Sequence, residues 1–309
     1  MELALISLEK IVEMAFMLLL GVMLFRVGII DSEMNKKLSN FLLLFVCPFL
    51  LFTSLQVDLT PERLRGFGQA FALSAVCFAS AILMTRFLVP KSQKYDTALE
   101  RICLIYSNCG FIGLPLLNAL FGRDGVLYMT AYMVWFNFLL WTQGVGLFEK
   151  KKQGIRSMLV NLRTPVIISI LIGLVFFFTG LRMPALLESP MEMIGNMNTP
   201  LAMLVAGVSL AESDIAAMLR KTRIYYISFL KLFVCPLLVL LLAGWAGFDE
   251  LPFMTVYIAA ACPSGTSGTL FALRYGRDNH YATELLAVTT VLSIVTIPAM
   301  ILLKKALFP

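Results

Sequence analysis

The sequence predicts an all-α polytopic membrane protein, and three observations support this prediction. Of the 309 residues, 59% are hydrophobic and only 14% are charged, whereas soluble domains have roughly 45–50% apolar and about 25% charged residues. Apolar segments of about the 20 residues that cross a bilayer follow one another along the chain. Runs such as LLVLLLAGWAG are apolar on every face, without the alternation that a transmembrane β-barrel requires.

Ten apolar segments are expected to cross the membrane as helices. The first should remain in the mature protein, because it opens with Glu2 where a secretory signal peptide carries basic residues, and no small-residue cleavage site follows. The expected spans are residues 6–30, 39–57, 67–89, 101–121, 125–148, 165–181, 190–211, 223–247, 251–274 and 281–304.

The distribution of Lys and Arg predicts the orientation. The links after helices 1, 3, 5, 7 and 9 hold 17 of the 25 basic residues, while the termini and the other links hold seven and Lys231 lies inside helix 8. By the positive-inside rule, the odd-numbered links face the cytoplasm and both termini face outward. The net charge of +6 is thus spread over the links, so no nucleic-acid partner is expected.

The two halves of the chain repeat a short motif. Residues 121–125 read FGRDG and residues 275–279 read YGRDN, an offset of 154 that is about half the chain length. Each motif follows an apolar segment that is interrupted by glycine and proline. With five helices in each half, the second copy enters the membrane from the other side. The sequence therefore predicts two inverted five-helix repeats, residues 1–148 and 165–309, joined by a short basic cytoplasmic link at 149–164, as is typical of secondary transporters.

Helices 4 and 9 are each interrupted by helix-disrupting residues, in YSNCGFIGLP and in ACPSGTSG. Proline removes a backbone donor and glycine adds freedom, and in a bilayer the freed backbone groups need protein, water or a ligand as partners. Two breaks at matching places in two repeats predict a substrate site, although two ordinary proline kinks, healed by Ser and Thr, would leave the same pattern. The candidate substrate-binding residues are Asn108, Gly110, Gly113 and Pro115 in helix 4, and Pro263, Ser264, Gly265, Thr266 and Ser267 in helix 9.

The chemistry of a broken helix favours a small anion. The second half of such a helix presents free amides and a partial charge of about +0.5, which suits a carboxylate, although the carbonyls that end the first half could equally hold a cation. Lys231 lies about 12 Å into helix 8, where it is an anion ligand, a charge that compensates the carbonyl ends, or a snorkelling lysine. Asn137 in helix 5 is a further candidate ligand or a bridge between helices, and Gln143 is similarly ambiguous.

The motifs SNCGFIGLPLL (107–117), FGRDG, VWFNFLLWTQG with Asn137, and CPSGTSGTLFALRYG (262–276) resemble the auxin efflux carrier family, which includes bacterial malonate-permease-like members. More distantly, the chain resembles bile-acid sodium symporters and sodium/proton antiporters. The resemblance implies ten helices in which helices 4 and 9 unwind and cross in mid-membrane. Helices 1, 2, 6 and 7 would form a scaffold and a homodimer contact, helices 3–5 and 8–10 a moving transport domain, and the bacterial cytoplasmic (inner) membrane the location.

The family's Asn before the crossover matches Asn108, but the offset of 154 places Cys262 opposite it, so symmetric recognition by two Asn residues is not expected. No enzyme activity is expected either. The GTSG motif contains Ser267, but the single histidine, His280, lies about 20 Å further along the helix axis, too far to act as its base. The six cysteines lie in apolar segments without a C-x-x-C pair, so neither a metal site nor a cofactor is predicted.

These features predict a secondary active or facilitative transporter of a small organic anion, a carboxylate such as malonate or an auxin-like acid, which works by elevator-like movement of the crossover domain. Acidic residues are absent from the centre of every expected span, which leaves three options open: coupling to sodium through neutral oxygens, coupling to protons, and no coupling. An anion or ion channel, or a ligand sensor built like a transporter, is the alternative function. The expected partners are the organic anion, a coupled H+ or Na+, and membrane lipid.

Overall fold

The computed structural model describes residues 2–148, 163–212 and 221–308. Within these ranges every regular element is helical, and strand-like pairing is limited to one antiparallel bridge between Ser107 and Ser264. Five helices are long and apolar enough to cross a membrane: Ser32–Ser54, Pro61–Leu88, Ala185–Ala211, Thr222–Ala243 and Asn279–Leu307. The predicted class, an all-α integral membrane protein, is confirmed.

The helices of the first half of the chain follow the order of the expected spans, although the fourth and fifth spans share α6. A π-helical turn (η) interrupts several of them. The elements are α1 (Glu2–Arg26), α2 (Ser32–Phe41), η1 (Leu42–Val46), α3 (Cys47–Ser54), α4 (Pro61–Leu88), α5 (Thr97–Ile105), η2 (Cys109–Gly113), α6 (Leu114–Leu139) and η3 (Leu140–Gly144).

The second half has a similar order of elements, and again a broken helix precedes the last long one. The elements are α8 (Pro165–Thr179), α9 (Ala185–Asn196), α10 (Asn198–Ala211), α12 (Thr222–Phe229), η4 (Leu230–Val234), α13 (Cys235–Ala243), α14 (Glu250–Ala261), α15 (Ser267–Arg274) and α16 (Asn279–Leu307).

The expected link at residues 122–124 is a kink inside α6. Gly122 has φ 59° and ψ −147°, a conformation that glycine adopts without a Cβ clash, and the helix continues on both sides of it. Gly276, at the same place in the second motif, has φ 61° and lies in the short link between α15 and α16. Both motifs therefore use glycine to redirect the chain.

Three π-helical turns have a common cause in the sequence. Each ends two residues before a proline: η1 before Pro48, η2 before Pro115 and η4 before Pro236. A proline inside a helix cannot donate to the carbonyl four residues earlier and its ring clashes with it, and a wider turn relieves that clash. No π-helical turn was predicted from the sequence, although the prolines mark all three positions.

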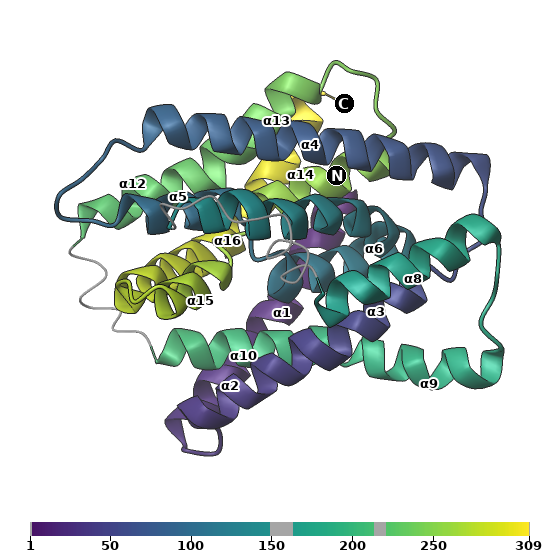
Figure 1. The fold of residues 1–309 in the computed structure, drawn as a ribbon, viewed down its shortest axis with the longest axis horizontal. Helices are drawn as coiled ribbons and strands as arrows, with labels where there is room; N and C mark the ends of the chain where they lie inside the picture. Colours follow the sequence, from purple (N-terminus) through teal and green to yellow (C-terminus); the bar gives the residue numbers. More distant parts are fainter. Residues whose placement is uncertain (1, 149–162, 213–220, 309) are drawn as a thin grey trace.

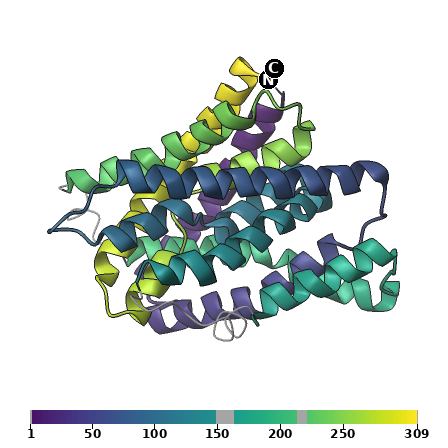
Figure 2. The ribbon, with the colours of Figure 1, turned by 45° about the horizontal axis from the view of Figure 1, so that its top comes forward.

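The helices pack around the two broken ones. Figures 1 and 2 show that α4 and α10 run on opposite sides of α5 and α6. The links at residues 89–96 and 275–278 lie at the left end of Figure 1, where α5, α12 and α16 begin. This end is called the α5 end below, and the right end, with the link at 180–184, the opposite end.

Helices α1 and α10 approach each other closely through glycines. A Cβ built on Gly21 would lie 2.4 Å from the carbonyl oxygen of Leu204, and one on Gly207 would lie 2.0 Å from that of Leu18. Small residues that let two backbones approach in this way stabilise helix pairs in membranes, where apolar side chains gain little by leaving lipid.

Candidate functional site

The two breaks predicted in helices 4 and 9 meet each other. The amide of Asn108 donates to the carbonyl of Pro263 at 2.8 Å, and the amide of Gly265 donates to the carbonyl of Tyr106, also at 2.8 Å. Between these bonds Ser107 and Ser264 form the antiparallel bridge. The backbone groups that the helices release thus pair across the breaks, which satisfies them inside an apolar protein.

Gly265 is required where the breaks cross. A Cβ at this position would lie 2.9 Å from the carbonyl oxygens of both Tyr106 and Ser107, which are backbone atoms and cannot rotate away. Gly113 also lies at the crossing, since a Cβ there would come 3.5 Å from the sulfur of Cys262. Gly110 is less constrained, because its nearest neighbour would be a side-chain carbon of Leu43 at 3.7 Å.

A pocket lies beside the crossing, toward the α5 end. It is narrow, with a cavity volume of about 20 Å³, and lies partly open between the crossing, α10 and α16. Most of the lining is apolar, and none of it is charged. The polar side chains of this crossover pocket are Asn108, Ser209, Thr266, Thr283 and Thr290.

Of the predicted residues, Asn108 and Thr266 line the crossover pocket, from one break each. Ser264 and Ser267 are buried at the second break, and within the described chain their hydroxyl oxygens have no hydrogen-bond partner. Pro115 lies in the first turn of α6. The structure therefore brings both halves of the predicted set together.

Lys231 approaches the crossing from η4 and is 1% exposed. Its ammonium nitrogen donates to the hydroxyl oxygen of Ser107 at 2.7 Å and to the carbonyl oxygen of Leu104 at 3.1 Å. Leu104 lies in the last turn of α5. This contact places the amine at the carbonyl end of α5, inside the protein and away from the membrane surface that a snorkelling lysine would reach.

Asn137 lies apart from this group. It is buried, its amide donates to the carbonyl of Met133 one turn earlier, and it lines a separate cavity between α6 and α8. Gln143, which was as ambiguous as Asn137 from the sequence, accepts a hydrogen bond at 2.8 Å from the hydroxyl of Tyr106, a residue of the first break. Tyr106 lies in the motif YSNCGFIGLP, but it was not a candidate because most of its side chain is an apolar ring.

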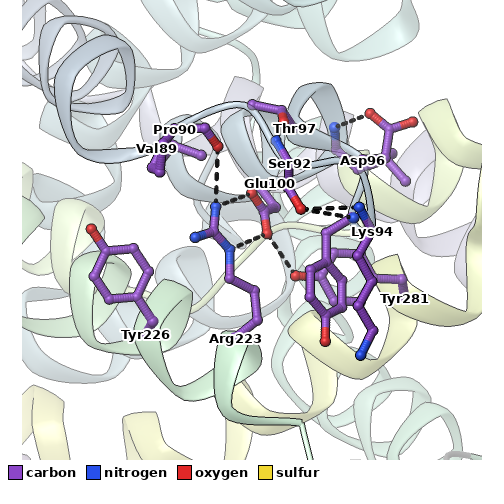
Figure 3. Close-up of polar contacts among 12 residues, drawn as sticks. Val89, Pro90, Ser92, Lys94, Asp96, Thr97, Glu100, Arg223, Tyr226 and Tyr281 are labelled. Carbon is purple, nitrogen blue, oxygen red and sulfur yellow. Dashed lines mark hydrogen bonds and ion pairs between the residues drawn. The ribbon is translucent and has the colours of Figure 1, made fainter.

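A buried charge cluster that was not predicted from the sequence lies at the start of α5. Glu100 in the first turn of α5 is fully buried, and Arg223 of α12 forms a two-pronged pair with its carboxylate at 2.7 and 2.8 Å. Tyr281 of α16 donates its hydroxyl to the same carboxylate at 2.8 Å (Figure 3). The cluster ties together the starts of three helices. The signal in the sequence was a glutamate at the edge of an apolar span.

Different ion pairs lie at the opposite end. Arg123, at the kink of α6, contacts Glu188 at 3.0 Å and Glu192 at 2.8 Å, both on α9. Burial opposes the charge of Arg123, but its bonds and charge interactions with Glu192 and Glu188 outweigh burial and raise its pKa. The second motif differs, because Arg277 pairs with Asp96 at 3.4 Å, just before α5.

Metal chemistry has no visible support in the described ranges. They hold no group of three His, Cys, Asp or Glu side chains that could bind a metal ion. All six cysteines are free thiols and buried. The polar groups at the crossing are instead amides, hydroxyls and one ammonium, which can bind a small polar molecule.

Similarity to known proteins extends over most of the chain. The family described as "Membrane transport protein" matches residues 6–301. The "Uncharacterized transporter YfdV" of Escherichia coli strain K12 is 22% identical over 301 residues, which cover 93% of this chain and 94% of that protein. An "Uncharacterized transporter" of Methanothermobacter thermautotrophicus is 22% identical over 94% and 96% of the two chains. A "Putative malonate transporter" of Rhizobium meliloti is 22% identical over 89% and 88%.

Proposed function

The chain belongs to the membrane transport protein family, that of the auxin efflux carriers, and from this premise we propose that it is a secondary active or facilitative carrier of a small organic anion. The observation that supports this most strongly is the pairing of two broken helices beside a pocket lined by Asn108 and Thr266. Broken helices that face each other are how many transporters build a substrate site within the bilayer.

The chemistry of the crossing favours a carboxylate. Ser264 and Ser267 supply buried hydroxyls that can donate to an anion, and the amide of Asn108 borders the pocket. The amino-terminal end of α15 carries a partial positive charge. The name of the Rhizobium meliloti relative makes malonate the first acid to test, and an auxin-like acid is the second.

We also propose that the ten spans form two inverted five-helix repeats, residues 1–148 and 165–309. Matching contacts in the two halves support this arrangement. Helix α1 packs on α10 as α8 packs on α3, and α4 packs on α14 as η4 packs on α5. The positive φ angles of Gly122 and Gly276 fall at corresponding places. The joining link at 149–164 lies almost wholly outside the described residues.

Within this arrangement, helices 1, 2, 6 and 7 would be the scaffold and homodimer contact, and helices 3–5 and 8–10 the moving transport domain. Two cavities support a seam between these groups. One lies where α1 and α10 face η2, α6 and α16, and the other lies where α6 faces α8. Weakly filled seams suit an elevator, because the moving part must slide past the fixed part.

The orientation proposed from the basic links puts the α5 end in the cytoplasm of a bacterial cell and both termini outside. The crossover pocket lies toward that end, near the end of α10 and the start of α16. At the opposite end, Arg123 links the kink of α6 to α9. These two features support an inward-facing state that is closed on the outside.

Uptake into liposomes tests the proposal. Purified protein is reconstituted, and a panel of labelled carboxylates that includes malonate and an indole acid is offered, with pH and sodium gradients varied separately. A carrier should accumulate or exchange at least one acid with saturation. Ion currents at channel rates without saturation would identify the channel alternative, and tight binding without any flux would identify the sensor. Either result would contradict a carrier.

A further inference from the structure

Lys231 is a buried cation whose hydrogen-bond acceptors are neutral. Its side chain is 1% exposed, and the two described acceptors are the hydroxyl of Ser107 and the carbonyl of Leu104. Burying an ammonium group costs several kcal/mol unless opposite charge compensates it. Two neutral acceptors do not supply that opposite charge, so a further source of negative potential must stabilise the ammonium group.

The carbonyl end of α5 supplies negative potential. The helix stops at Ile105, and Tyr106 is extended, so the last carbonyls lose their helical partners. A helix end of this kind carries about half a negative charge. Leu104 is in the last turn, and the Lys231 amine therefore lies where this potential is strongest. The sulfur of Cys235, one turn further along, lies 3.9 Å from the same carbonyl oxygen.

The same set of groups is what a transporter uses to bind a coupling cation. Carbonyls of unwound backbone and of half-helix ends coordinate Na+ in carriers built from broken helices. The oxygens of Leu104 and Ser107 are of this kind, and the second belongs to the crossing itself. A single positive charge suits them, because divalent ions prefer carboxylate ligands.

We propose that the Lys231 ammonium is a tethered cation that takes the place of a coupling cation at the end of α5, so that transport needs no sodium. Its removal by truncation opens a polar cavity that binds a free monovalent cation. The consequence for transport rests on the proposed carrier function. The cation binding of the truncated variant does not, because it is measured on purified protein without substrate.

The experiment compares the wild type, Lys231→Ala and Lys231→Met in detergent, in sodium chloride and in choline chloride of equal ionic strength. The melting temperature of the wild type should be the same in both salts. Lys231→Ala should melt lower in choline and rise by on the order of 3 °C once sodium exceeds its dissociation constant about tenfold. Lys231→Met is the matched control, because its apolar side chain refills the space and should show no response to sodium.

Two further measurements keep the result decisive. Uptake by the wild type should be equal in sodium and in choline, and a drop of tenfold or more in choline would overturn the proposal without any variant. A folded Lys231→Ala with no sodium response and no binding of radioactive sodium would also overturn it. If Lys231→Ala folds in neither salt, Lys231→Gln decides, because it keeps donors without charge. An unchanged melting temperature for Lys231→Gln would show that the charge is dispensable and overturn the proposal, whereas a loss of stability would support it.

Discussion

The two half-helices that lead into the crossing, α5 and α14, have similar shapes but are held in different ways. Helix α5 is bound by charge at both ends, through Glu100 and Arg223 at its start and Lys231 at its finish. Helix α14 is buried from Pro252 to Ala261 and carries no charged residue in that stretch. Both half-helices have ion pairs at their starts, since Asp249 pairs with Arg65 and Glu250 with Lys304 at the start of α14. Among the described contacts, however, a charged side chain reaches the crossing end only of α5.

This difference shows that the two half-helices share backbone geometry and not side-chain chemistry. Both charged groups that hold α5 come from the helix formed by α12 and η4. An offset of 154, at which Gly122 and Gly276 match, places Gln69 and Cys77 of α4 opposite them. Gln69 accepts a hydrogen bond from the amide of Asp249, just before α14. The crossing is thus chemically one-sided, and its two halves can be tested separately.

The largest expected effect is on the anchor of α5. Glu100→Gln leaves Arg223, whose side chain is 19% exposed, without its charge partner, at a cost that should approach the about 3–5 kcal/mol of fully buried pairs. On α14, Thr255→Val removes a hydroxyl that bonds only within its own helix, to Leu251, and should cost less than about 1 kcal/mol. Thermal unfolding in detergent measures both. Equal stability of the two variants would contradict the comparison.

The charge itself, and not the space around it, should explain that loss. The double variant Glu100→Gln with Arg223→Met removes both partners and leaves the hydroxyl of Tyr281 an amide to bond. Replacing a buried pair by groups of similar volume is often neutral, so the double variant should recover most of the stability. A double variant as unstable as Glu100→Gln would indicate that packing dominates.

The next effect concerns substrate. If the Asn108 amide bonds a carboxylate, Asn108→Ala removes a hydrogen bond to a charged group, worth about 1.5–3 kcal/mol, or roughly 10- to 150-fold in affinity. Thr266→Ala, from the other break, removes a hydroxyl from the same pocket and should cost less than about tenfold. Saturation of uptake gives both values, with melting temperature as a control for folding. A larger loss of affinity in Thr266→Ala than in Asn108→Ala would contradict this prediction, because the second break would then contribute more to substrate binding than the first.

A smaller effect is expected from the glycines of the two breaks. Gly265→Ala places a Cβ 2.9 Å from two backbone oxygens, and overpacking of this kind costs about 1–3 kcal/mol. Gly110→Ala meets only Leu43 at an ordinary 3.7 Å and should be close to neutral. Melting temperatures compare the two variants. If Gly110→Ala proves as harmful as Gly265→Ala, close approach is not the reason for glycine at the crossing.

The sequence predicted the helical membrane class and the two breaks, and the structure places Asn108, Pro263 and Gly265 where the breaks cross. Their cause is local, because proline and glycine disrupt a helix wherever they stand. That the two breaks meet was predicted from the repeated motifs, but which residues pair where they meet was not. The offset of 154 put Cys262 opposite Asn108, whereas the bridge pairs Ser107 with Ser264, and Asn108 bonds Pro263.

The remaining features depend on contacts between distant segments. Glu100 is read as the polar edge of a span until Arg223, 123 residues later, is brought to it. Asn137 lies just before the π-helical turn η3, and Gln143 lies within it. Only the fold shows that Gln143 contacts Tyr106 while Asn137 faces α8. Which side of a helix faces the crossing is set by packing that a single sequence does not specify.

The smallest expected change in stability separates the two GRD motifs, since Arg123 bonds across to α9 and Arg277 bonds to Asp96 beside α5. Arg123 is 39% exposed, so Arg123→Gln should cost at most about 1 kcal/mol of stability. The same energy shifts a balance between two conformations about fivefold away from the proposed inward-facing state. Labelling of Ser209→Cys in the crossover pocket by a membrane-impermeant maleimide measures that balance from the α5 side. Labelling should slow by up to that factor in Arg123→Gln and stay unchanged in Arg277→Gln, because only the first arginine joins the proposed transport and scaffold domains. Equal labelling in both variants would mean that the contact with α9 does not hold the outer side closed.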